Sequence, residues 1–429
     1  MNQRQYPNRV VVTGIGAITN VGLDADAAWD ALVSGACGIS PIHGEKFDRF
    51  GMDAFSVKIG GQIHDFDPAA TVGQRESKRL DRFAQLGIAA ALQAVERSGI
   101  EFDACDPTRC GVVIGSGVGG IQTIEDALHT MRDKNPSRMS PFTVPRLMAN
   151  AVAGDVSIRF GLEGYTTSHT TACASSGHSI GDAMRQIRDG NCDVVLAGGA
   201  EGAVSPLCLS AFMVMRAMST RNDDPAHASR PFDQDRDGFV LAEGAAVLVL
   251  ESEEHAKKRG ANILCELLGC GVSADAHHIT APDPNGKGAA AAMRYALRDT
   301  RLNPTDIDYV NAHGTSTPLG DQAEVAAAYE VFGDHARKSA GGKLLMSSTK
   351  SMIGHTLGAS GAVECLSCIG AIRHGTVTAT VNLESPDPEF EDIDLVPNTP
   401  RDARVDKVLN NTFGFGGHNV SLVLGRYEG

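Results

Sequence analysis

Short, continuous apolar runs recur along the chain and alternate with stretches of helical spacing. The first half has such runs at 9–13, 110–115, 193–199 and 244–251. An unbroken apolar run, rather than an alternating one, is typical of a parallel strand that is covered on both faces. Strands that alternate with helices predict an α/β fold with right-handed crossovers.

The second half repeats this scheme. We expect extended segments at 265–272, 308–312, 346–348, 377–381, 405–411 and 419–424, and helices at 288–301, 323–332 and 359–373. Both halves order as βαβαβαββ, which predicts an internal duplication of architecture. We therefore divide the chain into an N-terminal half, 1–260, and a C-terminal half, 261–429.

Two local patterns near the N-terminus need an interpretation. The first strand runs into Gly14-Ile-Gly16, and we interpret this GxG as a tight turn, because the third glycine of a dinucleotide fingerprint is missing. Residues 75–98 have the spacing of one long amphipathic helix, with a basic cluster near its start. A basic cluster is usually a solvated face, but in an acidic protein it can also dock an acidic partner.

The candidate nucleophile is Cys173, which lies in TACASSGHSIG at the predicted start of a helix that runs to about Arg188. Ile180, Met184 and Ile187 recur at helical spacing and should anchor that helix to a core. The free N–H groups and dipole of a helix N-terminus favour a thiolate and can bind an oxyanion. The alternative is a buried structural cysteine, and the local sequence does not decide between them.

Composition excludes several classes of function. The net charge of −14 argues against nucleic acid as the main partner, since phosphate binding needs a cationic face. The ten cysteines are scattered without a disulfide framework, and Cys365 and Cys368 form a CxxC in what reads as a buried helix. The N-terminus has no signal-peptide or transit pattern, and no apolar run is long enough to span a bilayer. We expect a cytoplasmic protein.

Three further motifs lie downstream of the cysteine in the sequence. His313 follows a buried strand in NAHGTSTPLGD, and His355 precedes a glycine-rich helix start in STKSMIGHTLGASGAVE. The third, NTFGFGGHN at 411–419, predicts a flexible turn whose aromatic residues are flanked by glycine. Each stretch alone is a weak signal, but together and in this order they are specific.

On these motifs, the chain resembles the β-ketoacyl-acyl carrier protein synthases, condensing enzymes of the thiolase fold. The resemblance runs from VVVTGIG to GFGGHNVSLVL, and residues before Arg9 lie outside it and receive no role. The Cys-His-His set is most similar to the elongating synthase II branch, because synthase III replaces one histidine by asparagine. His418 stands where many relatives carry threonine. The implied fold is α/β, with two pseudo-symmetric halves forming a five-layered αβαβα architecture.

The resemblance also implies roles for residues. Cys173 would take an acyl group from a carrier protein, with its own N–H and that of Phe415 as the oxyanion hole. His313 and His355 would be neutral and donate to the enolate formed when a malonyl group loses CO₂, the other ring nitrogen of each being held by a backbone partner. The sulfur and both rings should converge at one buried tunnel. Lys350 would order the site, with Glu364 as its partner.

Around the substrate, the resemblance places residues that bind the pantetheine arm, gate the tunnel or support its walls: Thr315, Thr317, Val118, Phe413, Glu324, Asp321 and Glu364. The residues that resemble the carrier-docking patch are Arg75, Lys78, Arg79 and Arg216. The implied partners are acyl carrier protein, whose phosphopantetheine carries the substrates, and a second copy of the chain. Neither nucleic acid nor membrane is expected as a partner. No cofactor or catalytic metal is expected, although there is room for a structural monovalent cation.

Three alternatives stay open at this point. One is a ketosynthase of the same fold in a polyketide or other secondary pathway, which the motifs do not separate from fatty-acid elongation. A second is a non-catalytic subunit like a chain-length factor, against which Cys173 and both histidines argue. The third is a cysteine hydrolase, which lacks support because no single histidine with an Asn/Asp orienting partner stands out.

Overall fold

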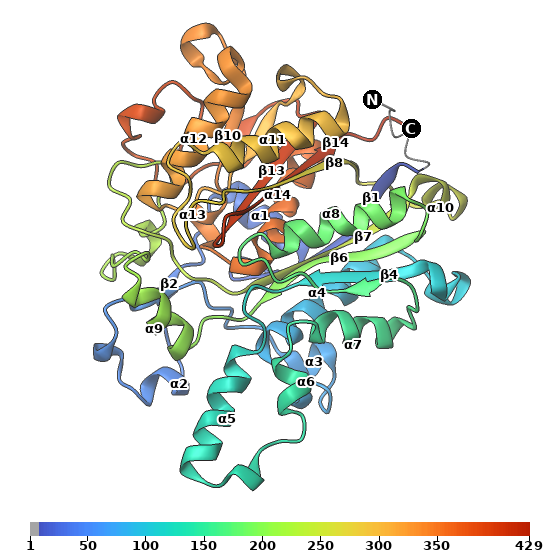
Figure 1. Ribbon diagram of the computed structural model, residues 1–429, viewed down its shortest axis with the longest axis vertical. Helices are drawn as coiled ribbons and strands as arrows, with labels where there is room; N and C mark the ends of the chain where they lie inside the picture. The colour runs from blue at the N-terminus through green and yellow to red at the C-terminus, as the bar shows by residue number, and fades with distance from the viewer. Residues whose placement is uncertain (1–7) are drawn as a thin grey trace.

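The computed structural model describes residues 8–429, and ten of its strands form one long sheet of two equivalent halves (Figure 1). The strand order is β10-β9-β13-β14-β8-β1-β7-β6-β4-β5. The first half comprises β1 (Val10–Thr19), β4 (Cys110–Gly115), β5 (Thr166–Thr167), β6 (Val194–Glu201) and β7 (Gly244–Ser252). The second comprises β8 (Cys265–Ala274), β9 (Tyr309–Asn311), β10 (Leu345–Ser347), β13 (Lys407–Gly414) and β14 (His418–Gly425).

The two halves share one topology. In each half, the third strand along the chain lies at the outer edge, followed in space by the second, fourth, fifth and first. The halves meet where β1 and β8 pair through Val11–Glu266 and Val12–Cys265. The duplication expected from the sequence is therefore confirmed. Residue 260 lies between helix α10 (Glu253–Lys258) and β8, and that boundary stays a prediction.

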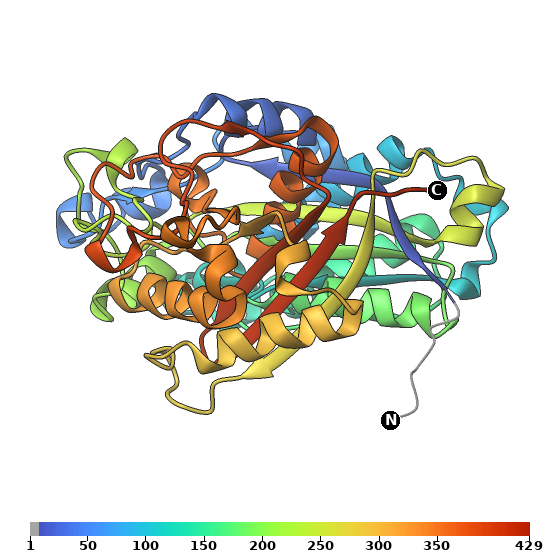
Figure 2. The same ribbon diagram turned by 90° about the horizontal axis from the view of Figure 1, so that it is seen from above.

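Helices cover both outer faces of the sheet and fill the space between its two halves (Figure 2). Helices α4 (Arg82–Ser98) and α7 (Ala151–Phe160) cover the outer face of the first half, and α11 (Lys287–Thr300) and α12 (Pro318–Phe332) cover that of the second. Helices α8 (Ser175–Arg188) and α14 (Ser360–His374) pack against each other between the two halves of the sheet. The expected five-layered αβαβα architecture is confirmed.

Strand β7 shows why the apolar runs are unbroken. Leu248 and Leu250 face the central core between the sheet halves, whereas Val247 and Val249 face the outer core under α4. Each of these side chains is fully buried, and burying one contributes about 1.5–3 kcal/mol. Both faces of the strand must therefore be apolar. The expectation that such runs form parallel strands holds where β4 pairs with β6 but is wrong for β7, which pairs antiparallel with both β1 and β6, because an unbroken run reflects burial on two faces rather than strand direction.

The prediction of a tight turn at Gly14-Ile-Gly16 is wrong. Strand β1 continues through both glycines to Thr19. A Cβ at Gly14 or Gly16 would collide with the carbonyl oxygen of Ala94 or Ala90 on α4. The glycines therefore allow a helix to pack directly on the strand backbone, which is a packing reason rather than a turn.

The prediction of one helix over 75–98 is also wrong at its start. Helix α4 begins at Arg82, and the residues before it form the short 3₁₀ turn η2 (Ser77–Arg79). Asp81 is extended, and its carboxylate accepts hydrogen bonds from the N–H (2.7 Å) and hydroxyl (2.6 Å) of Thr123. Thr123 lies on α5 (Ile121–Asp133), so a tertiary contact sets where α4 begins.

Other segments differ less from expectation. The strand expected at 377–381 is the two-residue β11 (Thr376–Val377), paired with β12 (Arg401–Asp402). The flexible turn expected at 411–419 is shorter, because β13 continues to Gly414 and pairs Phe413 with Asn419 of β14.

Residues 1–7, which fall in the stretch given no role, lie outside the described residues. No helix within 8–429 is both long and apolar enough to cross a membrane.

Candidate active site

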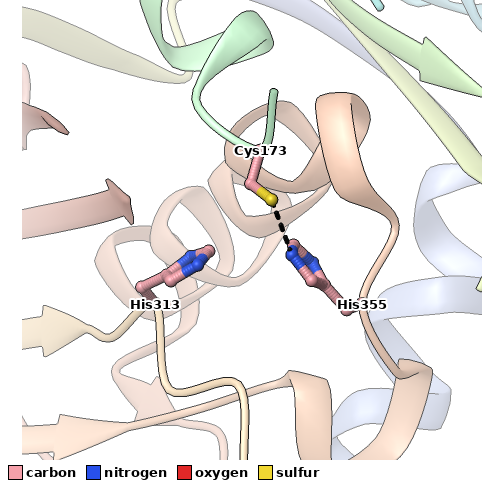
Figure 3. A group of neighbouring side chains, drawn as sticks. All are labelled: Cys173, His313 and His355. Carbon is pink, nitrogen blue, oxygen red and sulfur yellow. Dashed lines mark hydrogen bonds between the residues drawn. The ribbon is translucent and has the colours of Figure 1, made fainter. Parts of the chain in front are cut away.

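Three side chains from separate segments meet at one point of the molecule (Figure 3). Cys173 lies just before α8, His313 follows β9, and His355 follows the short helix α13 (Lys350–Ile353). The Nε2 atom of His355 lies 3.0 Å from the Cys173 sulfur, and the two imidazole rings are 5.3 Å apart between centroids. All three side chains line one cavity of about 560 Å³. The convergence expected from the sequence is therefore present.

The backbone before α8 exposes the sulfur to this cavity. Ala172 adopts a left-handed conformation (φ 51°), which turns the chain sharply before Cys173. The Ser175 hydroxyl donates to the Ala172 carbonyl (2.6 Å) and accepts from the Thr171 N–H (2.9 Å), which holds this turn. The predicted anchors Ile180, Met184 and Ile187 lie in the central core.

Burial decides the protonation of the cysteine. The N–H groups of Cys173 and Phe415 both point at the sulfur, and Lys350 adds a favourable charge, so all three lower the pKa of the thiol. Desolvation outweighs them and raises the pKa of Cys173 to about 12. The N–H groups act in the expected direction, but burial outweighs them, so the expectation of a thiolate is wrong and Cys173 is a thiol at pH 7.

The two histidines are held differently from expectation. Nδ1 of His355 lies 2.9 Å from the Ser360 hydroxyl, and Nδ1 of His313 is buried without a hydrogen-bond partner among residues 8–429. The expected backbone partners are therefore absent from both Nδ1 atoms. Burial, with the positive charge of Lys350 as the second cause, lowers the pKa of both imidazoles well below the ordinary value of 6.5, so both rings are neutral at pH 7.

A buried ion pair supplies that charge. Lys350 and Glu364 form a salt bridge, as expected, and both side chains are almost fully buried. Glu364 lies on α14 behind the cavity wall, and one of its oxygens has no hydrogen-bond partner. The ammonium group donates a hydrogen bond to Glu364 and acts on the thiol and on both imidazoles through space.

Two further carboxylates hold the loop that carries His313. Glu324 accepts from the backbone N–H groups of His313 (2.8 Å) and Gly314 (2.7 Å). Asp321 accepts from the N–H groups of Ser316 (3.1 Å) and Phe232 (2.8 Å), and burial raises its pKa to about 7. Glu324 reaches the cavity wall, whereas Asp321 and Glu364 lie behind it.

Of the remaining predicted residues, some line the cavity and others lie outside it. Thr315 and Thr317 share a hydroxyl hydrogen bond of 3.0 Å, and the ring of Phe413 packs on His313 with centroids 5.8 Å apart. Besides Cys173, His313 and His355, the predicted residues in the cavity wall are Val118, Arg216, Thr315, Thr317, Phe413, Phe415 and Glu324. Arg75, Lys78 and Arg79 are exposed on the segment before α4, outside the wall.

Sequence reasoning missed two polar residues at the site. Ser360 orients His355, and Glu201 ends β6 behind the cavity. An acidic residue directly after a buried apolar strand, as in DVVLAGGAE, was the available signal for Glu201. Ser360 lay within a quoted motif, but its hydroxyl gives no signal apart from its proximity to His355.

The cysteines and the clusters of possible metal ligands in residues 8–429 indicate no second site of this kind. Cys365 and Cys368 lie on the buried helix α14, as expected, and all ten cysteines are free. Within the described part of the chain, only Cys173, His313 and His355 bring three His, Cys, Asp or Glu donor atoms within 4.8 Å of one another.

Comparison with known proteins gives a consistent result over the whole chain. The family model for the β-ketoacyl synthase N-terminal domain matches residues 7–256, and that for the C-terminal domain matches 264–384. A 3-oxoacyl-[acyl-carrier-protein] synthase 2 from Coxiella burnetii is 45% identical over 418 residues, covering 97% of this chain and 98% of that protein. The protein of the same name from Synechocystis is 44% identical over 420 residues, covering 98% of both.

Solved structures agree with these matches. A β-ketoacyl synthase from Burkholderia phymatum superposes with a TM-score of 0.89 at 34% identity, covering 98% of this chain and all of that one. A type II polyketide ketosynthase, solved in complex with its acyl-carrier protein, AntDE:AntF, has a TM-score of 0.89 at 30% identity, covering 98% of this chain and all of that one. Sequence identity to the synthase 2 proteins is higher than to either structure.

Proposed function

Because this chain belongs to the β-ketoacyl synthase family, we propose that Cys173, His313 and His355 together condense an acyl group with malonyl-acyl carrier protein. The products are CO₂ and a β-ketoacyl-carrier two carbons longer, and the reaction elongates fatty acyl chains. The observation that carries the assignment of residues is the convergence of one thiol and two neutral imidazoles at one cavity.

In the first step, the Cys173 sulfur attacks the carbonyl carbon of an acyl-carrier thioester. Its pKa of about 12 means that no thiolate waits at neutral pH, so the proton must leave as the sulfur attacks. His355 Nε2, 3.0 Å away, accepts that proton and returns it to the departing pantetheine thiolate. The N–H groups of Cys173 and Phe415 stabilise the oxyanion of the tetrahedral intermediate.

In the second step, the malonyl group loses CO₂ and the electron pair of the broken bond passes to the thioester oxygen. His313 and His355 donate hydrogen bonds to this enolate oxygen. His355 must donate from Nε2 here, although the same atom accepts a proton in the first step. The Ser360 hydroxyl permits both, since a hydroxyl can accept from Nδ1–H in one step and donate to Nδ1 in the other.

In the third step, the enolate carbon attacks the acyl carbonyl on Cys173, and collapse of the intermediate expels the sulfur, which regains a proton from solvent. Phe413 and Phe415 fit the role of a gate, because both line the cavity and Phe413 packs on His313. Val118 lies in the same wall and would contact the acyl chain, while Thr315 and Thr317 offer hydroxyls to the pantetheine amides.

We also propose that a structural monovalent cation binds behind the site. The side-chain oxygens of Asn311 and Asn410 and one oxygen of Glu364 are buried without a hydrogen-bond partner. Asn311 and Asn410 pair in register on the parallel strands β9 and β13, so both face the same side, and Asn410 donates to Gly361 of α14. A bound Na⁺ or K⁺ would satisfy these oxygens and supply positive charge, with no part in bond making.

The partners follow from the named relatives and from two surfaces. We assign carrier docking to Arg75, Lys78, Arg79 and Arg216, which suit an acidic partner. We also propose a homodimer through the open edge of the sheet at β5. Exposed apolar side chains lie on or next to α6 (Thr143–Leu147), α7 and β5: Val144, Met148, Ile158 and Tyr165. The cytoplasmic location stays a prediction.

A role in a secondary pathway is the second candidate. Ketosynthases of polyketide assembly share the fold at 30% identity, whereas the synthase 2 relatives reach 45%, which favours chain elongation. The test is to supply purified protein with malonyl-carrier and a ladder of acyl-carriers and to size the products. Products one two-carbon unit longer support elongation, and repeated extension to polyketones contradicts it.

A further inference from the structure

A buried carboxylate joins the segments that form the active-site walls. Glu201 is 0% exposed at the end of β6, and its oxygens accept from the Ser116 hydroxyl (2.9 Å) and the N–H groups of Gly117 (2.8 Å) and Gly358 (3.1 Å). A longer bond comes from the N–H of Val118 (3.4 Å). Each of these donors is a backbone N–H or a hydroxyl, and such donors form stronger hydrogen bonds with an ionised carboxylate than with a neutral carboxyl group.

The two segments that donate come from opposite halves of the chain. Ser116–Val118 follows β4 and places Val118 in the cavity wall, while Leu357 and Gly358 follow His355 and place Leu357 in the same wall. A Cβ at Gly358 would collide with the Gly117 nitrogen, so the two backbones touch. Glu201 lies at this contact and bonds to both sides.

Backbone strain at the same place needs a restraint. Leu357 has a left-handed conformation (φ 44°), which costs a non-glycine residue on the order of 1–3 kcal/mol and persists only where the surroundings fix it. The N–H group immediately after Leu357 is the Gly358 donor to Glu201. The carboxylate therefore stabilises the conformation that points Leu357 at the cavity.

We propose that Glu201 is a positioning residue of this site: it ties the Val118 wall to the Leu357 wall and so fixes the space for the acyl chain on Cys173. This inference rests on the proposed function for the identity of the substrate. It assigns Glu201 no contact with the reacting atoms, because the side chain lies behind the cavity wall.

Charge gives the proposal a second, independent readout. Burial raises the pKa of Glu201 to about 7, and the ionised carboxylate in turn raises the pKa of the Cys173 thiol, against the opposite effect of Lys350. Cys208 is the other titratable group on which Glu201 acts. Removing the Glu201 charge should therefore lower the pKa of Cys173. The same substitution should weaken the contact between the Val118 and Leu357 walls.

The experiment compares two rates in Glu201→Gln and wild-type enzyme above the pKa of about 7. One is acylation of Cys173 by acyl-carriers of increasing length, and the other is alkylation of the Cys173 peptide by iodoacetamide, both followed by mass spectrometry. We expect acylation by long chains to fall about tenfold or more, since misplacement by ~1 Å can cost ~100-fold. Alkylation should become several-fold faster, and the inflection that ionisation of Glu201 gives the wild-type pH profile of alkylation near pH 7 should disappear. Easier access to the thiol alone would produce the first effect but not the second.

Two variants serve as controls. Ser116→Ala removes one donor and keeps the carboxylate, so acylation by long chains should weaken moderately with alkylation unchanged. Glu251→Gln alters another fully buried carboxylate, held by Thr13, His255 and Arg259 at the far end of β7, and both rates should match wild type.

The proposal is overturned if folded Glu201→Gln shows wild-type acylation at every chain length and a wild-type alkylation rate. If that variant does not fold, an unchanged chain-length ranking in Ser116→Ala overturns the proposal instead. Failure of the proposed function is distinguishable, because the wild type would then not be acylated by any acyl-carrier while iodoacetamide still reports the effect of Glu201 on the thiol.

Discussion

The imidazoles of His313 and His355 lie edge to face, with their planes at 82° and their centroids 5.3 Å apart. This geometry lets both rings direct a nitrogen at one oxygen atom without stacking on each other. Only His355 reaches the Cys173 sulfur within hydrogen-bond distance. In the proposed mechanism, both rings therefore stabilise the enolate, whereas His355 alone activates the thiol.

That division predicts different losses for the two histidines. His313→Ala should keep acylation of Cys173 near the wild-type rate, whereas His355→Ala should lose both acylation and malonyl decarboxylation. Each should lower decarboxylation by about 10²–10³, the usual effect of removing one oxyanion donor. The rates are measured separately by intact-protein mass and by CO₂ release.

His335→Ala is the matched control, since His335 lies close to the carbonyl oxygen of Ile307, outside the cavity wall. Equal loss of acylation in His313→Ala and His355→Ala would contradict the division of roles.

The depressed pKa values predict a flat pH dependence for decarboxylation. Because burial and Lys350 keep both imidazoles neutral well below 6.5, lowering the pH through 6.5 protonates neither ring. In Cys173→Gln, which cannot be acylated, CO₂ release from malonyl-carrier should stay constant across that range. A half-loss centred near 6.5, together with an NMR titration of the His313 or His355 imidazole at the same pH, would refute the neutral-pair mechanism; the NMR signal separates the rings from Asp321 and Glu201, whose pKa values lie at about 7.

The buried ion pair between Lys350 and Glu364 predicts that loss of the cation alone destabilises the protein more than loss of both charges. Lys350→Met leaves the Glu364 carboxylate buried without its cation, which should cost about 3–5 kcal/mol in the free energy of unfolding. Adding Glu364→Gln removes the stranded charge and should recover most of that loss. Urea titrations of the three proteins test this, and equal stability of the single and double variants would contradict it.

The docking assignment predicts a salt-sensitive effect on the carrier. Reversing Lys78 and Arg79 to glutamate should raise KM for acyl-carrier severalfold at low ionic strength, with little change in kcat. The difference should shrink as salt screens exposed charges. Reversal of Lys258 and Arg298, exposed on α10 and α11, is the matched control. An unchanged KM in the first variant at low salt would exclude this patch.

Much of the architecture was predictable because it leaves a local signature. Strands such as β6 and β7 are buried on both faces, so their apolar runs are continuous and readable from the sequence alone. The convergence of Cys173, His313 and His355 was predictable for another reason: each lies in a motif whose order along the chain resembles one family.

The errors share a physical cause, which is contact between distant segments. Gly14 and Gly16 look like a turn until α4 is seen packed on them, and the start of α4 depends on Asp81 bonding to Thr123. The pKa of Cys173 likewise depends on burial by the whole fold rather than on its helix. The sequence marks Glu201 as an acidic residue at the end of an apolar strand, but its bonds to Gly117 and Gly358 depend on contact between distant segments.

The most direct test of the account is the mass of the enzyme after incubation with acyl-carrier alone. Wild-type protein should gain one acyl group on the Cys173 peptide, and malonyl-carrier should then release it as a β-ketoacyl product two carbons longer. Cys173→Ala should gain nothing, while Cys173→Gln should condense nothing and still release CO₂ from malonyl-carrier. An acyl group on any other residue, or equal loss of condensation and decarboxylation in Cys173→Gln, would contradict the central claim.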